Sequence, residues 1–307
     1  SWQDVDRLYI ASGEDPVSTF RYAGAAAQLA HCLRLAKVKD PQGVDWEKEA
    51  RESYAWALAH TLPNDAVKVH RLYAAAALFR LTGELAFEAQ VKKDFDPTAE
   101  LWFENLYGPA VYALGTKGDP QLLTTVRAAI LRTADLAHDT AQNRALRWGG
   151  NWGMPMLIGH QTTPWTMETA VARQITTDPA KRKVYTADLY TTCDYFLGTN
   201  ALNQTWITGL GPRHPVNVFH MDAWYNGKPT VHPGIIPYGP WRKQKEFGQG
   251  PWENDWANKT VYPAIDLWPG NERYFDNRCS PLSGEFTIHQ NTAPAAAIFG
   301  ILCAEKR

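Results

Sequence analysis

Apolar residues recur at helical spacing through the first two thirds of the chain. Several of these periodic runs follow an Asp or an Asp-Pro pair, and both are typical of a helix start. The pattern therefore predicts a series of helices packed in antiparallel pairs. They are expected at about residues 15–39, 45–60, 64–83, 84–93, 98–107 with a continuation toward 113, 119–136 and 178–198.

The pattern changes between about residues 205 and 283. This stretch is rich in Pro, Gly, Asn, Trp and Tyr and has few periodic apolar positions. So long a segment without regular structure is usually either functional or disordered, and its tryptophans argue against disorder. The expected arrangement is an all-helical fold with a long aromatic loop laid over one end.

Length and charge limit the class of protein. A chain of 307 residues can form one large domain or two, and the absence of a low-complexity linker favours one domain over residues 1–307. With 31 basic and 32 acidic side chains, there is no electrostatic case for nucleic acid or an anionic membrane as partner. No apolar run reaches the ~18 residues of a membrane span. The partner is expected to be neutral.

Aromatic and cysteine content refine this picture. The chain has 13 Trp, 13 Tyr and 11 Phe, and indole faces can stack on sugar rings, although many of these residues must serve as core filler. The cysteines show no metal-ligand spacing, so buried thiols are expected rather than a zinc site, and their disulfide state stays open. They are Cys32, Cys193, Cys279 and Cys303.

A polar cluster over residues 274–293 carries the strongest chemical signal. It holds an Asp, an Arg, a Glu, a His, a Gln and an Asn, and an apolar run over 295–302 that favours a buried helix follows it. A carboxyl group beside apolar surface keeps its proton to higher pH and can act as an acid. Glu285, between Gly284 and Phe286, is the candidate, and a helix cap is the alternative.

The same cluster resembles the C-terminal signature of glycoside hydrolase family 9, the cellulase family with an (α/α)6 barrel. The positions in register are Tyr274, Asp276, Glu285, Thr287, Asn291 and Thr292. Pro281 stands where the signature has a second aromatic residue. The resemblance implies that Glu285 is the catalytic general acid and Asp276 a neighbouring active-site residue.

Two earlier stretches are similar to the same family. Residues 194–202 resemble an Asp-Tyr-hydrophobic-Leu-Gly-x-Asn-Pro-Leu segment with Ala201 in place of Pro, and residues 208–211 resemble its Thr-Gly-Phe-Gly. The family then has Pro-His-His-Arg, where this chain has Phe219, His220 and Met221 at the last three positions. His220 is a candidate sugar contact or a satisfied loop histidine.

The lost Arg leaves room for other sugar contacts. Asp222, Trp224 and Tyr225 are the candidates that could replace it. Trp148, in a stretch that resembles the family's Trp-Gly-Ser-Asn, is a candidate sugar platform, and an aromatic packed under the loop is the alternative. No cofactor or metal site is expected from the motifs, and a structural calcium is not assignable.

Hydrolysis with inversion needs two carboxyl groups roughly 6.5–9.5 Å apart, an acid and a base. The family supplies the base from an Asp-Ala-Gly-Asp motif that is absent here, and residues 12–15 are the nearest string but precede a helix. The chain also shows no signal peptide and begins as though within a domain. We therefore expect a fragment whose base and first barrel helices lie upstream, with that N-terminal part as its partner.

These observations lead to one main hypothesis. The expected fold is an all-α (α/α)6 barrel of the six-hairpin glycosidase type, incomplete at its N-terminus. The expected function is an inverting glycoside hydrolase that cleaves β-linked glucans, with a polysaccharide or oligosaccharide substrate and a secreted or periplasmic location implied by the family. The alternatives are an exo-acting glycosidase on a related β-glycan and a non-catalytic carbohydrate-binding fragment.

Overall fold

The computed structural model describes residues 13–102, 104–147, 167–220, 223, 227, 231–240, 261–264, 267–278, 281–287 and 303. Within these ranges the chain is helical and forms no strand, which confirms the all-α prediction for this part. Contacts group the chain into two units. Unit 1 comprises Ser1–Ala99 and Glu104–Val126, and unit 2 comprises Glu100–Phe103 and Arg127–Arg307.

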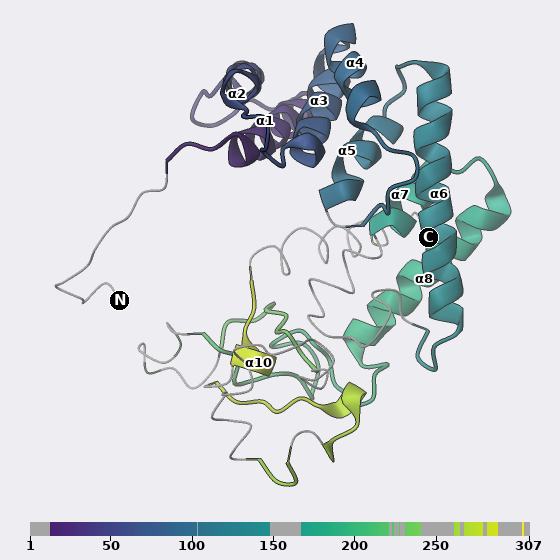
Figure 1. Ribbon diagram of the computed structural model, residues 1–307. Helices are drawn as coiled ribbons and strands as arrows, with labels where there is room; N and C mark the ends of the chain where they lie inside the picture. Colours follow the sequence, from purple (N-terminus) through teal and green to yellow (C-terminus); the bar gives the residue numbers. More distant parts are fainter. Residues whose placement is uncertain are drawn as a thin grey trace. The chain divides into compact units, whose positions relative to one another are not determined.

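Unit 1 is built from helices joined by short turns (Figure 1). The helix α1 packs against α2 and α3, and α3 also packs against α4 and α5. Their bounds are α1 (Pro16–Ala36), α2 (Trp46–His60), α3 (Lys68–Thr82), α4 (Leu85–Asp94) and α5 (Glu104–Ala113). The helix α6 (Pro120–Gln142) begins in unit 1 and continues into unit 2.

Local chemistry explains why these helices start where they do. The carboxylate of Asp15 accepts a hydrogen bond from the Ser18 N–H at 2.8 Å and precedes Pro16, so both the capping side chain and the fixed φ of proline favour the first turn of α1. Asp45 caps α2 in the same way through the Lys48 N–H at 3.1 Å.

Small residues set the packing in unit 1. The four alanines Ala74–Ala77 of α3 are fully buried, so α3 contacts other elements on every face. A Cβ at Gly24 of α1 would lie 2.4 Å from the Tyr73 ring, which shows that α1 and α3 approach more closely than any larger residue would allow. Helix α3 is therefore the centre of this core.

Unit 2 contains α7 (Met167–Ile175) and α8 (Pro179–Leu197), which pack together. Asp178 caps α8 by accepting from the Ala180 N–H at 2.8 Å. His138 of α6 lies 2.9 Å from the buried Asp188 carboxylate of α8, so a polar contact joins these two helices. None of the helices in the described ranges has the length and apolar character that a membrane crossing requires.

Most of the remaining described part of unit 2 is a loop layer, which comprises residues 199–220, 231–240, 274–278 and 281–287. Its regular elements are short: the described ranges show a 3-10 turn at Gly270–Glu272 beside it and α10 (Pro281–Gly284) within it. Thr208 joins its parts, because its N–H donates to the Ile235 carbonyl at 2.9 Å and its own carbonyl accepts from Gly234 N–H at 2.8 Å.

An aromatic core supports the loop layer from beneath. Trp206 is fully buried against Tyr274, with ring centroids 4.9 Å apart in an edge-to-face arrangement. Tyr195 and Phe196 at the end of α8, together with Ile236, complete this cluster. The prediction of a long aromatic loop is thus confirmed for the described residues, and Trp206 is one of the tryptophans that serve the core.

Some expected boundaries are wrong. Helix α5 begins at Glu104 rather than near residue 98, because the Asp96 carboxylate accepts from the Thr98 N–H and hydroxyl and closes a turn there. Helix α3 begins at Lys68 rather than residue 64, and α7 was not expected. Buried thiols were expected; of the three cysteines that the structure describes, Cys193 is buried, whereas Cys32 and Cys303 are exposed, and Cys279 lies outside the described residues. The helix expected over residues 295–302 lies outside the described residues.

Candidate active site

Three segments of the loop layer far apart in sequence lie side by side. The Phe219 N–H donates to the Gly284 carbonyl at 2.8 Å, and the Tyr238 N–H donates to the Glu285 carbonyl at 2.7 Å. The Gly239 N–H donates in turn to the Ser283 carbonyl at 3.1 Å. Residues 283–285 are therefore held between the segment that ends at His220 and the segment around Tyr238.

Gly284 makes this close approach possible. A Cβ built there would lie 3.2 Å from the Phe219 nitrogen and 3.3 Å from the Asn277 oxygen, both backbone atoms that cannot rotate away. A larger residue would push the segments apart. The residue before Glu285 thus fixes how closely the candidate acid approaches the neighbouring loop.

Asp276 binds the backbone of the same loop. One carboxylate oxygen accepts from the Val216 N–H at 2.8 Å and the other from the Asn217 N–H at 2.9 Å. The Tyr274 hydroxyl also donates to it at 3.2 Å. Burial, followed by the charge of Asp276, raises the pKa of Tyr274 well above its ordinary value, so this hydroxyl keeps its proton.

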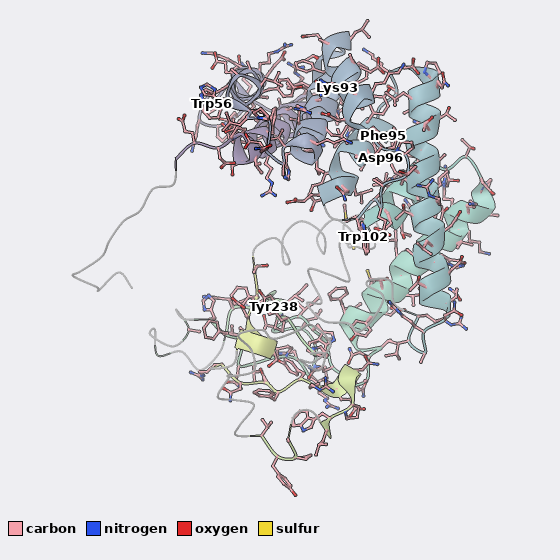
Figure 2. All side chains as sticks on the ribbon, in the orientation of Figure 1. Trp56, Lys93, Phe95, Asp96, Trp102 and Tyr238 are labelled. Atoms are coloured by element: carbon pink, nitrogen blue, oxygen red, sulfur yellow. The ribbon has the colours of Figure 1, made fainter. Side chains whose placement is uncertain are left out.

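Glu285 is half-buried and pairs with Tyr238. The position of Tyr238 in the described part of the chain is labelled in Figure 2. The Tyr238 hydroxyl is hydrogen-bonded to the Glu285 carboxyl group. Burial, the negative charge of Glu285 and this hydrogen bond together raise the pKa of Tyr238 to about 12. Tyr238 is therefore a neutral donor near neutral pH, and it holds the Glu285 side chain from one side.

His220 lies on the other side of the same segment. Its ring stacks on Phe286 with centroids 5.6 Å apart and planes tilted by 21°, and it meets His232 edge to face at 5.3 Å. Its Nδ1 accepts from the Ala223 N–H at 3.2 Å. Because Nδ1 is the acceptor in this bond, the N–H of the ring is on Nε2, which can donate to a hydroxyl group.

The structure thus brings together three of the residues expected from the sequence, Glu285, Asp276 and His220. The other expected site residues, Trp148, Asp222, Trp224 and Tyr225, lie outside the described residues. In the described ranges, no group of three or more His, Cys, Asp or Glu side chains could hold a metal ion. Asp15, in the string nearest to the family's base motif, caps α1 instead.

Sequence reasoning missed Tyr238. It stands between Pro237 and Gly239 in a loop with several prolines and glycines, so no periodicity singles it out. Gly239 adopts a positive φ of 78°, which places the chain in a turn directly after Tyr238. The Pro-Tyr-Gly-Pro string was the one available signal, and it indicates a turn rather than a partner for Glu285.

Comparison with known proteins now decides the family. The model of glycosyl hydrolase family 9 matches residues 2–298. The chain belongs to glycosyl hydrolase family 9. A comparison with curated protein sequences gave no significant match.

Solved structures agree with this family 9 assignment. A thermostable single-mutant endoglucanase from Alicyclobacillus acidocaldarius superimposes with a TM-score of 0.77 at 21% identity, over 99% of this chain and 58% of that one. AaCel9A in complex with cellobiose-like isofagomine gives 0.75 at 22%, over 98% and 58%. A family 9 protein from Bacteroides ovatus gives 0.73 at 16%, over 97% and 56%.

These matches confirm the expected fold class, the helical (α/α)6-barrel architecture of family 9. The chain spans 58% of the length of the first two of these structures. At identities near 20%, the likeness establishes the fold, and the chemistry has to be argued from the site itself.

Proposed function

We propose that this protein is an inverting glycoside hydrolase that cleaves β-linked glucans, with Glu285 as the general acid. One observation carries the assignment of roles. Both oxygens of Asp276 accept backbone N–H groups, whereas Glu285 has a single side-chain partner, Tyr238, in the described part of the chain. Of these two signature carboxyl groups, Glu285 is the one able to reach a substrate oxygen.

In this proposal each residue has a distinct task. Glu285 transfers its proton to the glycosidic oxygen as the bond to the anomeric carbon breaks, so that the leaving sugar departs as an alcohol. Tyr238 positions the Glu285 carboxyl group, and the Nε2–H of His220 donates to a sugar hydroxyl. Asp276 keeps residues 216–220 in place and so positions His220.

The reaction also needs a base that removes a proton from water on the opposite face of the sugar. Asp276 is poorly suited to be this base, because both of its carboxylate oxygens already accept hydrogen bonds from backbone N–H groups. The expectation that the base comes from an upstream Asp-Ala-Gly-Asp segment stays a prediction. So does the family-based expectation of a secreted or periplasmic protein.

The family and its solved structures support a carbohydrate substrate. One of these structures is an endoglucanase, and another is a complex with cellobiose-like isofagomine. A formal net charge of -1 over 307 residues suits a neutral polymer better than a polyanion. We propose a cellulose-like β-glucan, and the candidate platforms Trp148, Trp224 and Tyr225, with Asp222, as further contacts.

The decisive experiment replaces Glu285 by Gln in the complete protein that contains this chain. A general acid contributes typically 10²–10⁴-fold, and least where the leaving group needs no proton. Hydrolysis of cello-oligosaccharides should fall by about that factor, whereas an activated aryl glycoside should keep most of its rate. Glu272→Gln, which removes an exposed carboxylate from the same unit, is the matched control.

Two outcomes would contradict the proposal. Equal loss on both substrates would remove Glu285 from the role of acid, and a wild-type protein that binds cello-oligosaccharides without cleaving them would favour the carbohydrate-binding alternative. Proton NMR of the first product anomer tests inversion separately, because an inverting enzyme releases the α-anomer from a β-linked substrate.

A further inference from the structure

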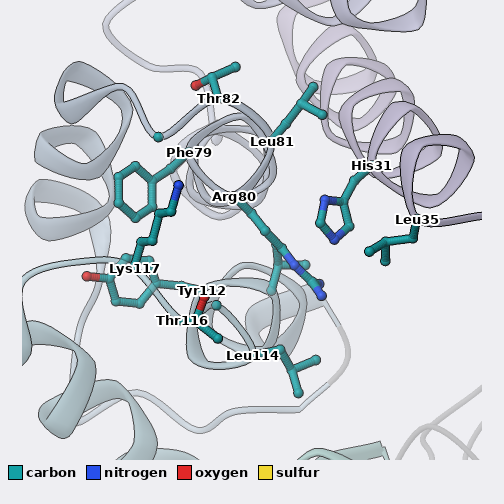
Figure 3. A pocket seen from close by; sticks show the side chains of 13 residues that line it. His31, Leu35, Phe79, Arg80, Leu81, Thr82, Tyr112, Leu114, Thr116 and Lys117 are labelled. Atoms are coloured by element: carbon teal, nitrogen blue, oxygen red, sulfur yellow. The ribbon is translucent and has the colours of Figure 1, made fainter. Parts of the chain in front are cut away.

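Unit 1 contains a cavity of about 370 Å³ whose lining comes entirely from that unit. It lies where α1 and α3 end and where the segment after α5 begins, and the side chains around it are shown in Figure 3. Its size falls within the range of small-molecule sites, roughly 300–1,000 Å³. The residues of the candidate active site belong to unit 2, so this cavity is a separate feature of the chain.

The cavity is lined by cations without counter-charges. Arg80 of α3, Lys117 of the segment after α5 and His31 of α1 line it, and no Asp or Glu is among its lining residues, all of which are described. In Figure 3 the Arg80 guanidinium group extends toward the side of the cavity where His31 lies. Low-dielectric walls around charges of one sign concentrate their potential inside the cavity.

Arg80 differs from every other described arginine of unit 1. The other four each form an ion pair with a carboxylate: Arg21 with Glu104, Arg34 with Glu47, Arg51 with Glu84, and Arg71 with Asp94 at 2.8 Å. Arg80 has no ion pair or hydrogen bond within the ranges that the structure describes, and the same is true of Lys117. The N–H donors of the half-buried Arg80 guanidinium group thus have no acceptor among the described residues.

The ends of the surrounding helices account for these cations only in part. Helix C-termini attract positive charge, and Arg80 stands in the last turn of α3, but several of the carbonyls there already bond to other groups, and the Leu81 carbonyl accepts from the Arg34 guanidinium at 3.3 Å. The Lys37 N–H caps α1, the Gly83 N–H donates to Phe79 at 2.7 Å, and the Gly115 N–H donates to Tyr112 at 3.0 Å. No carbonyl hydrogen bond therefore explains why the Arg80 and Lys117 side chains face the cavity.

The pKa of His31 responds to the positive charges around the cavity. Its pKa is lowered from the ordinary value, first by burial and then by the positive charges of Arg80 from α3 and Arg34 from its own helix. A third positive charge is thus disfavoured in the cavity. A bound anion would offset that repulsion, so the His31 ring is a sensitive probe of occupancy.

We propose that this cavity binds a monosaccharide-sized anion, whose phosphate or carboxylate oxygens are held by Arg80 and Lys117. The planar guanidinium group offers two parallel N–H donors to such a group, and the lysine adds a point charge from the other side. The site would give the protein a ligand distinct from its neutral glucan substrate, and it does not depend on the function proposed for Glu285.

The test is a titration of the complete protein followed through the His31 ring signals by NMR, with calorimetry in parallel. The probes are inorganic phosphate, glucuronate and, as the neutral comparison, glucose, at constant ionic strength. Phosphate or glucuronate should shift His31 and bind saturably, while glucose should not. Which of the two anions binds tighter identifies the group that the cavity takes.

Matched variants assign the effect to the site. Arg80→Gln and Lys117→Gln should each weaken anion binding at least about tenfold, as expected for loss of a charge-assisted contact. Lys93→Gln removes an exposed cation of the same unit outside the cavity and should leave binding unchanged. If Arg80→Gln lowers the melting temperature, the exposed Lys117 still provides a test. Absence of a His31 response to both anions, or equal weakening by Lys93→Gln, would overturn the proposal.

Discussion

The helix starts of unit 1 and the loop layer of unit 2 depend on hydrogen bonds of very different reach along the chain. The cap of α1 joins residues three apart, Asp15 and Ser18. In the loop layer, Asp276 reaches Val216 across 60 positions, and the Thr208 hydroxyl reaches the Ile235 N–H across 27. The helix starts of unit 1 are thus specified locally, although ion pairs such as Arg21–Glu104 then join its helices, whereas the loop layer forms only when distant segments meet.

This difference also separates packing from chemistry. The core of unit 1 depends on many small apolar contacts, such as those of Ala74–Ala77, each of which contributes little. The loop layer depends on a few polar bonds around Asp276 and Glu285, each of which positions a candidate site residue. Loss of a single bond should therefore matter more in the loop layer than loss of a comparable contact in the helices.

The largest effect is expected for Asp276→Ala. Two backbone N–H groups, Val216 and Asn217, lose a charged acceptor, and a hydrogen bond to a charged group contributes about 1.5–3 kcal/mol. Amide exchange at these two residues should speed up by about 10² or more, while the amides of α1 and α3 keep their protection. Hydrogen exchange measured by NMR checks this.

Asp276→Asn is the graded control for that measurement, since its amide keeps one acceptor oxygen, and it should lose less protection than Ala. Equal acceleration in α1 and α3 would show that unit 1 and the loop layer open together. The contrast between the two regions would then be wrong.

An intermediate effect is expected for Gly108→Ala in α5. The new methyl group would lie 2.7 Å from Leu72 Cγ and 3.0 Å from the Tyr73 nitrogen, a backbone atom of α3 that cannot turn aside. Overpacking of this kind costs typically 1–3 kcal/mol, so the melting temperature should fall. Gly13→Ala, where a Cβ meets nothing within 4 Å, should leave it almost unchanged. Equal melting curves for both variants would mean that α5 can move away from α3 at little cost.

The smallest effect concerns pH and the buried Glu168 of α7. Burial raises the pKa of this carboxyl group well above its ordinary value. The folded protein therefore holds a proton that the unfolded chain releases, so stability falls as the pH rises from about 4.5 toward the folded-state pKa. Glu168→Gln should remove this slope, seen as a melting temperature that declines less between about pH 5 and 8.

The exposed Glu100 provides the control for that series, since Glu100→Gln should leave the decline as it is in the wild type. Parallel profiles for the wild type and Glu168→Gln would mean that Glu168 is ionised in the folded protein. The pH dependence would then have to come from other groups.

The sequence predicted the helices best where a capping residue marks the helix N-terminus. Asp15, Asp45 and Asp178 were read as helix starts, and each accepts a backbone N–H at its helix N-terminus. The start of α5 was wrong, because the turn at Asp96 depends on a side-chain contact that interrupts an otherwise acceptable pattern. Periodicity measures apolar spacing and does not register such local competition.

For the candidate site, the family signature supplied Glu285 and Asp276, and a second stretch similar to the family supplied His220, but neither supplied their partners. Tyr238 and the amides of Val216 and Asn217 come from segments whose approach depends on the packing of Trp206 and Tyr274 beneath them. A single sequence contains no record of such pairings between distant loops. The contacts that orient a site are therefore what a structure adds to a motif.

The position of Asp276 has a practical consequence for enzyme engineering. A library that keeps Glu285 and varies residue 276 would select for loop geometry, although the residue belongs to a catalytic signature. Inactive members would owe their failure to a displaced His220 rather than to a missing proton, and second substitutions in the loop over residues 214–218 could restore them. When the oxygens of a signature carboxylate bond to the backbone, the substitutions tolerated at that position therefore indicate how the loop is held and not which group transfers a proton.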